Sequence, residues 1–470
     1  MASSPPGTSG LKSGLGNRQM TMIAIGGVIG AGLFVGSGKA ISTAGPGVLL
    51  AYIGVGALVV LIMRMLAEMA VAHPETGSFS SYANRELGPW AGLSVGWLYA
   101  YQWCVTIGFE AVAGAAIVNR LLPAIPSWLA ALVFMAALIA INLVQVSSFG
   151  EFEFWFALIK VTAIVAFIAL GAAALLGLVP GFDSPGLANL TAHGGFLPEG
   201  GTAVLLAALA VFFSFFGTEV VTVAAGEAVD PVHAVRRGMN SVVWRILVFY
   251  IGSIFVVLAL LPWNSAQVSE SPYVAVLQRL GIPGAPVIMD VIVLSAVLSC
   301  LNSGIYSSSR MLYALAERGE APALFTKVTR TGVPAWSVLA ASSIGLVTVV
   351  ANYFLPTEAV FNFLLDSSGA IAVVVYLCIA VTQFRGRRRL ERQNPGALTI
   401  KMWAFPHLTI AVVIGLLAVI AGMAFNADSR HSLLLTLAVT AVAVAAGVVH
   451  QNRTRARTTE RSTSTSEEKL

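Results

Sequence analysis

Residues 26–38 read Gly-Gly-Val-Ile-Gly-Ala-Gly-Leu-Phe-Val-Gly-Ser-Gly, and this stretch decides the fold more than any other part of the chain. It lies inside a hydrophobic run over residues 20–41, and six of its thirteen residues are glycine. A glycine costs a helix interior roughly 1 kcal/mol relative to alanine. One or two glycines would indicate only close packing between helices. Six favour a break in the helix, which a membrane tolerates only where the backbone lines a cavity or is buried in protein.

The composition places this run in a membrane protein. Of the 470 residues, 57% are hydrophobic and 10% are charged, and the mean hydropathy is +0.84. A soluble domain carries roughly 25% charged residues and cannot bury so much apolar surface, which excludes an ordinary soluble enzyme. The net charge of +5 is explained by the basic loops of a membrane protein, so no nucleic-acid partner is expected. The cysteines and histidines show no disulfide or metal-ligand spacing, so neither a metal nor another cofactor is expected.

Twelve apolar runs are long enough to cross a bilayer, which takes about 20 helical residues. They lack the two-residue alternation of a barrel, so they predict an all-α polytopic membrane protein with 12 transmembrane helices. The runs cover residues 20–41, 46–71, 91–119, 127–146, 152–178, 202–228, 238–261, 285–315, 335–354, 359–384, 403–425 and 431–450. The membrane domain then spans residues 19–450, between polar tails at 1–18 and 451–470 whose composition predicts disorder.

Basic residues predict the orientation of the chain. With both termini in the cytoplasm, all but five of the 27 Lys and Arg lie on the cytoplasmic side, six of them in the loop 385–401. The exceptions are Lys39, Arg120, Arg279 and Arg430 outside, and Lys160 within the membrane. We therefore expect a multi-pass membrane protein, surrounded by lipid, with both termini cytoplasmic.

A second candidate break lies in the sixth run. Residues 212–219 read Phe-Phe-Ser-Phe-Phe-Gly-Thr-Glu, which puts a glycine and an acid in the middle of a span. Two interrupted helices, one in each half of the chain, are typical of a transporter site built on structural repeats, here spans 1–5 and 6–10. The exposed amides at a half-helix N-terminus suit a carboxylate.

Ionisable residues inside spans are costly and are therefore functional candidates. Lys160 lies eight residues beyond Phe152 and can exchange a proton during a cycle, unless it snorkels to the interface. Glu219 is either a gate or proton acceptor, or a structural carboxylate. Glu110 either faces a bound amine or ties helices together. Asp290 lies early in the eighth span, and we interpret it as structural.

Two further charged residues, Arg64 and Glu68, lie four residues apart and are expected to pair on the surface of their helix.

Several motifs resemble a known family over nearly the whole chain. They are Met-Arg-Met-Leu-Ala-Glu-Met-Ala at 63–70, Pro-Glu-Thr-Gly-Ser-Phe at 74–79, Gly-Glu-Phe-Glu-Phe-Trp at 150–155, Ser-Cys-Leu-Asn-Ser at 299–303, Arg-Met-Leu-Tyr at 310–313 and Asp-Ser-Ser-Gly-Ala-Ile at 366–371. The chain resembles the amino acid transporter family of the amino acid–polyamine–organocation (APC) superfamily, and within it the bacterial permeases of 4-aminobutyrate (GABA). The resemblance implies a five-plus-five inverted repeat with broken helices 1 and 6, followed by two extra helices.

The resemblance also implies a site. The substrate carboxylate would dock on backbone amides at Gly30, Ala31 and Gly32, and the amine would meet main-chain oxygens near the first break and in 213–217. An aromatic lid falls at Phe213. The expected substrate-binding residues are Val28, Gly30, Ala31, Gly32, Glu110, Phe213, Phe216 and Gly217. Lys160 matches a lysine that replaces a sodium ion in proton-coupled relatives, and with Glu219 it forms the expected proton-coupling set.

The expected function is therefore import of an amino acid, with GABA as the named candidate, by proton symport and alternating access. A permease for another amino acid, such as alanine, proline or an aromatic one, is the main alternative. An amino acid sensor on the same fold is less favoured, because the tails are short. An enzyme is not expected, because neither a nucleophile with its base nor clustered metal ligands are visible in the spans.

Overall fold

The computed structural model describes residues 11, 14–27, 29–355, 357–425 and 427–467, and in 24–26, 31, 357–369, 427–428 and 457–467 the backbone only. The described chain is helical, and its only strand-like pairing is an isolated bridge between Leu15 and Ala228. The longer helices are α1 Asn17–Gly26, α3 Gly36–Ala44, α4 Val48–Ala72, α5 Ser78–Leu87, α6 Pro89–Leu121, α7 Ser127–Val144, α8 Val146–Leu175, α9 Gly200–Phe215, α11 Pro231–Trp244, α12 Ser253–Leu260, α14 Pro272–Arg279, α15 Ala285–Glu317, α16 Ala335–Phe354, α17 Thr357–Gln393, α18 His407–Phe425 and α19 Ala427–Glu467. Short helices α2 Ala31–Phe34, α10 Val220–Ala224 and α13 Ala266–Glu270 lie between them, and a π-helical turn at Arg245–Gly252 joins α11 to α12.

Among the described residues, eleven stretches are long and apolar enough to cross a membrane. All twelve predicted spans have a helical counterpart. Eleven stretches are found instead of twelve because the first span is not one helix, and its second half is joined to the second span in the stretch Gly32–Ala72. Residues 20–41 are divided among α1, α2 and α3, so the predicted break is confirmed.

The two breaks lie against each other at the centre of the bundle. α9 ends at Phe215 and α10 begins at Val220, so the sixth span is interrupted as well. Between them, Gly217 has a φ of 106°, which a residue with a side chain rarely adopts. A Cβ at Gly217 would also lie 2.7 Å from the carbonyl oxygen of Gly27. Glycine is therefore required at this crossing both by conformation and by contact.

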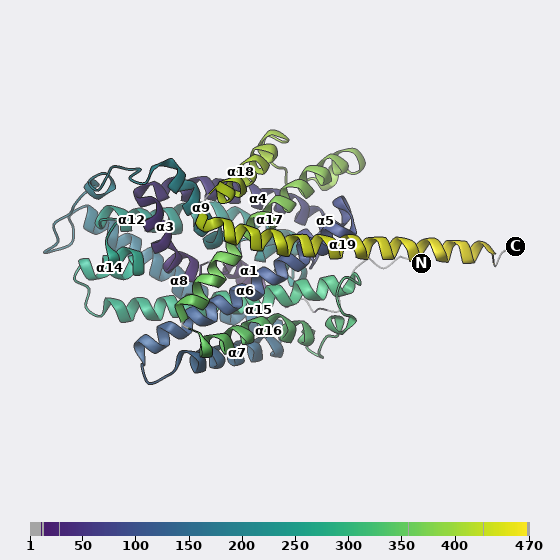
Figure 1. The fold of residues 1–470 in the computed structure, drawn as a ribbon, viewed down its shortest axis with the longest axis horizontal. Helices are drawn as coiled ribbons and strands as arrows, with labels where there is room; N and C mark the ends of the chain where they lie inside the picture. The colour runs from purple at the N-terminus through teal and green to yellow at the C-terminus, as the bar shows by residue number, and fades with distance from the viewer. Residues whose placement is uncertain (1–10, 12–13, 28, 356, 426, 468–470) are drawn as a thin grey trace.

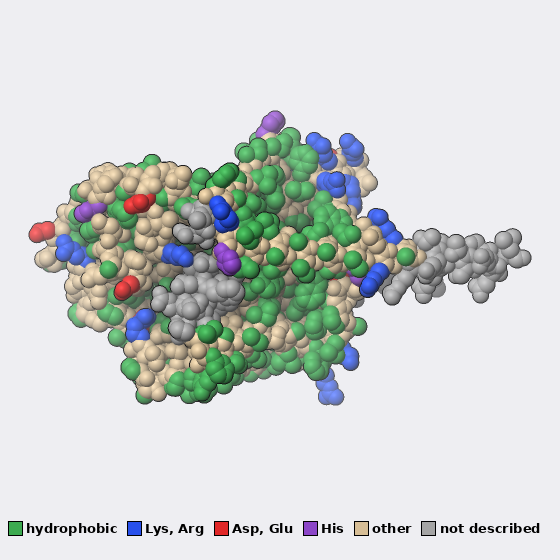
Figure 2. Space-filling view, in the orientation of Figure 1, with side chains coloured by type: hydrophobic (Ala, Val, Ile, Leu, Met, Phe, Trp, Pro, Cys, Tyr) green, Lys and Arg blue, Asp and Glu red, His purple; other side chains and the backbone are tan. Residues whose placement is uncertain are grey.

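The central helix α6 packs against α15, α16, α17 and α19, and these helices shield it from the surroundings (Figure 1). The outer surface carries the opposite character. Figure 2 shows hydrophobic side chains across the middle of the visible face, larger clusters of Lys and Arg toward the end where α19 leaves the bundle, and acidic side chains with scattered Lys and Arg toward the other end. An apolar belt between polar ends is what a bilayer requires.

At the basic end of the bundle, Glu68 joins α4 to α17. Its carboxylate accepts hydrogen bonds from Arg387 at 2.7 Å, Gln383 at 2.9 Å and the Met402 amide at 2.6 Å. The expected pairing with Arg64 is therefore wrong, since the Arg64 guanidinium donates instead to the carbonyl of Lys401. The carboxylate finds more donors across the helix interface than along its own helix.

Both tails contain more structure than their composition predicts. Helix α19 continues to Glu467 and projects beyond the other helices (Figure 1). Extending a formed helix needs no new nucleation, which explains helicity in a polar sequence. In the N-terminal tail, the amides of Gly14 and Leu15 donate to the carbonyl of Glu227 at 3.1 and 3.2 Å.

Candidate functional site

A small central cavity lies between the two breaks and α6. Its volume of about 10 Å³ holds roughly one water molecule, so the site is closed, and its walls must move before an amino acid can enter. It is lined by Gly30, Gly32, Trp103, Thr106, Glu110, Phe213, Phe216 and Cys300. Five of the expected substrate-binding residues are thus brought together. Of the others, Ala31 begins α2, Val28 lies outside the described residues, and Gly217 is not part of this lining.

Glycines in the first break allow its neighbours to approach closely. A Cβ at Gly30 would lie 2.6 Å from Oε1 of Glu110 and 2.9 Å from Cβ of Cys300. A Cβ at Gly32 would lie 3.1 Å from Cα of Ser214. The glycines of the first break therefore let Glu110, Cys300 and the second break lie directly against its main chain.

Aromatic rings form one wall of the cavity. Phe213 packs edge-on against Phe109 with ring centroids 5.0 Å apart. Phe216 lies 5.5 Å from Trp103 and 5.7 Å from Tyr99. This wall comes from the second break, so any opening of α9 would move it.

Glu219 caps the second break rather than lining the cavity. Its buried carboxylate accepts the Gly217 amide at 3.1 and 3.2 Å and the hydroxyl of Tyr376 at 3.1 Å. It thereby satisfies a backbone donor that the break would leave without a partner, and it ties the break to α17.

Lys160 lies at the first break and is fully buried, so it does not snorkel. Its ammonium donates to the carbonyl of Ile29 at 2.9 Å and to Oγ of Ser299 at 2.8 Å. Ser299 in turn donates to Oε1 of Glu153 at 2.6 Å, and that oxygen lies 3.9 Å from the lysine nitrogen. A buried cation, a hydroxyl and a buried carboxylate are thus connected in one short chain.

The sequence interpretation missed Glu153. A usable signal was present, because Glu153 and Lys160 are seven residues apart, or about two helical turns, and so share one face of α8.

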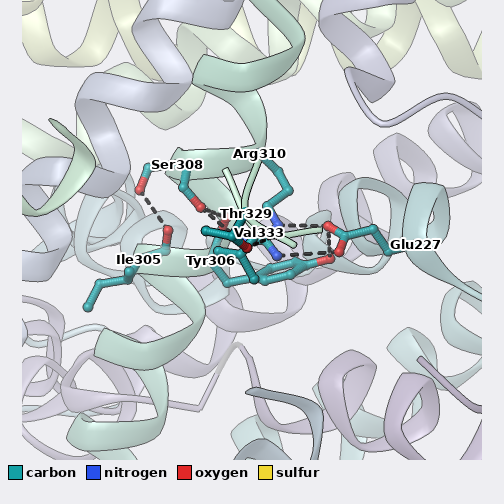
Figure 3. Close-up of polar contacts among 8 residues, drawn as sticks. Glu227, Ile305, Tyr306, Ser308, Arg310, Thr329 and Val333 are labelled. Carbon is teal, nitrogen blue, oxygen red and sulfur yellow. Dashed lines mark hydrogen bonds and ion pairs between the residues drawn. The ribbon is translucent and has the colours of Figure 1, made fainter. Parts of the chain in front are cut away.

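A second buried ion pair closes the bundle near the N-terminal segment (Figure 3). The carboxylate of Glu227 accepts hydrogen bonds from Arg310 at 2.7 and 3.3 Å and from the hydroxyl of Tyr306 at 3.1 Å. The guanidinium also lies 4.2 Å from the centre of the Tyr306 ring. Because the Glu227 carbonyl accepts the amides of Gly14 and Leu15, this cluster joins α15, the end of the sixth span and the segment before α1. The sequence interpretation gave Glu227 no role.

Comparison with known proteins gives a consistent result. A family model described as "Amino acid permease" matches residues 19–459. The gamma-aminobutyric acid permease of Bacillus subtilis (strain 168) is 52% identical, over 95% of this chain and 95% of its own. A probable GABA permease of Pseudomonas aeruginosa is 50% identical, over 94% of this chain and 93% of its own. An aromatic amino acid transport protein of Corynebacterium glutamicum is 41% identical, over 90% and 91%.

Among solved structures, the chain is similar to Mhp1, a nucleobase-cation-symport-1 family transporter, in a closed conformation with bromovinylhydantoin bound. The TM-score is 0.54, the identity is 15%, and the match covers 95% of this chain and 96% of Mhp1. At this identity the likeness concerns the fold alone.

Proposed function

This chain belongs to the amino acid permease family, and from that membership we propose that it imports GABA across the bacterial plasma membrane together with protons. Relatives named GABA permeases are 50 to 52% identical, whereas the aromatic amino acid transporter is 41% identical. That difference supports GABA as the substrate, and α-amino acids are the second candidate. Proton coupling is supported above all by the position of Lys160, which is buried and donates a hydrogen bond to the carbonyl of Ile29 in the first break.

The substrate carboxylate docks on the main chain at residues 30–32, and the wall of Phe213 and Phe216 covers it. Glu110 lies beside this dock, since its Oε1 is only 2.6 Å from where a Gly30 Cβ would be. Two carboxylates this close cannot both be ionised in a dry site. A docked substrate therefore requires a proton on Glu110 or movement of its side chain, and the first case links one proton to one substrate.

Lys160 and Glu153 form the second proton-handling unit. A proton leaving the ammonium can reach the carboxylate through the Ser299 hydroxyl, because each step spans less than 3 Å. Because Lys160 also bonds the carbonyl of Ile29, its protonation state acts directly on the broken helix. Glu219 holds the second break closed against α17.

Transport proceeds by alternating access, in which the helices move as two bundles around the breaks. The Glu227–Arg310 cluster is the closure on the side of the N-terminal segment. We assign spans 1–5 and 6–10 to two inverted repeats, because one break falls in each half and the two meet. The gathering of Lys and Arg at one end of the molecule (Figure 2) supports cytoplasmic termini.

Uptake of labelled GABA into proteoliposomes, with an inward proton gradient and no sodium, tests this function. We expect accumulation that excess unlabelled alanine, proline or phenylalanine does not displace. No GABA uptake, with uptake of a labelled competitor, would replace the substrate while keeping the mechanism. Uptake of GABA that ignores the proton gradient would refute proton coupling.

A further inference from the structure

A second cavity, of about 560 Å³, lies at the end of the bundle opposite the basic loop. Helix α6 gives its position: this helix starts beside Gln451, whose side chain accepts the Trp90 amide, and it ends at Leu121 on the other face. The lining there comes from α6, α13, α14 and α15 and from the junction of α2 and α3. Its volume is in the range of small-molecule sites, which is roughly 300–1,000 Å³.

The outer cavity and the central one are lined by neighbouring parts of the same two helices. On α6, Glu110 lines the central cavity, whereas Ala113, Ala116 and Arg120 line the outer cavity. Ten residues of helix separate Glu110 from Arg120, or about 15 Å. On the broken helix, Gly32 faces the central cavity and Phe34 the outer one. A ligand entering from this end therefore passes Arg120 before it reaches Glu110.

The charged lining has the two signs that an amino acid carries. Arg120 donates from Nε to Oδ2 of Asp290 at 3.1 Å and from Nη2 to Oδ1 at 2.5 Å. The Arg120 side chain is 63% exposed and the Asp290 side chain 10%. Glu270, which is exposed on α13, adds a second carboxylate to the lining. The pair is open to water on the Arg120 side, and a ligand that carries both charges can offer a carboxylate to Arg120 and an ammonium to Asp290 in place of each other.

We propose that the outer cavity binds the transported amino acid as a zwitterion before it enters the central cavity. The ligand carboxylate takes the two-pronged donor of Arg120, a geometry that guanidinium groups favour. Its ammonium takes Asp290, with Glu270 supporting it. The inference rests on the proposed function, because the ligand is the transported amino acid. The competing explanation is that Arg120 and Asp290 only tie α6 to α15.

A cysteine-protection experiment separates these explanations. Ala116→Cys places a thiol in the outer cavity, and wild type supplies the background, because Cys104 and Cys300 are buried and Cys378 is half-buried. A membrane-impermeant thiol reagent is applied with and without GABA, and uptake is measured on the same proteoliposomes. At ten times the dissociation constant, about one cavity in eleven stays free, so modification slows about 11-fold.

Four variants, each combined with Ala116→Cys, locate the protecting ligand. Arg120→Gln should abolish protection, whereas Arg279→Gln, an exposed arginine at the end of α14, should leave it intact. Gly30→Ala, which fills the central cavity, should stop uptake and keep protection. Asp290→Asn repeats the test should Arg120→Gln fail to fold.

The outcomes are distinct. Protection that survives both Arg120→Gln and Asp290→Asn, or disappears in Gly30→Ala, overturns the outer site. Uptake of GABA by Ala116→Cys without any protection overturns it as well, while the proposed function stands. Absence of both uptake and protection refutes the proposed function itself.

Discussion

Replacing Gly30 by alanine should both destabilise the protein and stop transport. The new methyl group would lie 2.6 Å from Oε1 of Glu110 and 2.9 Å from Cβ of Cys300. The glutamate is a flexible side chain and can move away. The Cys300 Cβ is fixed to α15, so the break and α15 must separate by a few tenths of an ångström.

The magnitude follows from the packing. Overpacking of this kind costs about 1–3 kcal/mol, and the contact with a fixed Cβ places Gly30→Ala toward the upper end. Gly54→Ala is the matched control, because Gly54 is exposed on α4 and a Cβ there meets nothing within 4 Å. It removes a glycine from a helix interior, a gain of up to about 1 kcal/mol. The two variants should therefore differ by about 2–4 kcal/mol in the free energy of unfolding.

The assay is unfolding in mixed micelles, followed by tryptophan fluorescence as the denaturing detergent fraction rises, together with GABA uptake. Gly30→Ala should unfold earlier than wild type, and it should lose uptake because the added methyl group occupies the central cavity and moves Glu110. Gly54→Ala should match or exceed wild-type stability and transport normally. Wild-type stability and uptake in Gly30→Ala would refute the close approach on which the site is built.

Three further perturbations test other parts of the structure. Lys160→Met should allow GABA to equilibrate down its own gradient but abolish accumulation driven by protons. Lys39→Met, at an exposed position, should keep proton-driven accumulation. Proton-driven accumulation in Lys160→Met would contradict the coupling role. Glu68→Ala should cost about 1–3 kcal/mol in unfolding free energy, because the Gln383 amide and the Met402 N–H lose their buried acceptor while Arg387 keeps Glu391 at 2.7 Å; an unchanged unfolding curve would contradict this. Arg310→Ala should cost more, about 3–5 kcal/mol, because it leaves the buried Glu227 carboxylate without its cation. Replacing Arg310 and Glu227 together by methionine should recover most of that loss, and a double variant as unstable as the single one would show that the charges themselves are not the cause.

Local patterns in the sequence predicted both breaks. Glycine weakens the helix at its own position, so the glycines of residues 26–38 and Gly217 predict the breaks without knowledge of any other segment. The burial of Lys160 followed from the membrane itself, which leaves few places for a charge in a long apolar span.

Partnerships between helices could not be predicted in the same way. The partner of Glu227 is 83 residues away, and the hydroxyl that joins Lys160 to Glu153 is 139 residues from the lysine. A single sequence does not show which helix faces meet. The predicted partner of Glu68 was wrong for this reason. Spacing along one helix points only to Arg64, whereas the actual partner, Arg387, lies on another helix. The helicity of α19 beyond residue 450 depends on a helix already formed within the bundle.

The Glu227–Arg310 pair also imposes an order on how the protein is made. The carboxylate leaves the ribosome 83 residues before the guanidinium, which at about 5–20 residues per second is a delay of roughly 4–17 s. Lys160 has no such delay, since Glu153 is already in its own helix. During that interval Glu227, at the end of the sixth span, lacks the cation that neutralises it in the folded protein. We therefore expect a chain truncated before residue 310 to accumulate in the membrane in smaller amounts than the full chain.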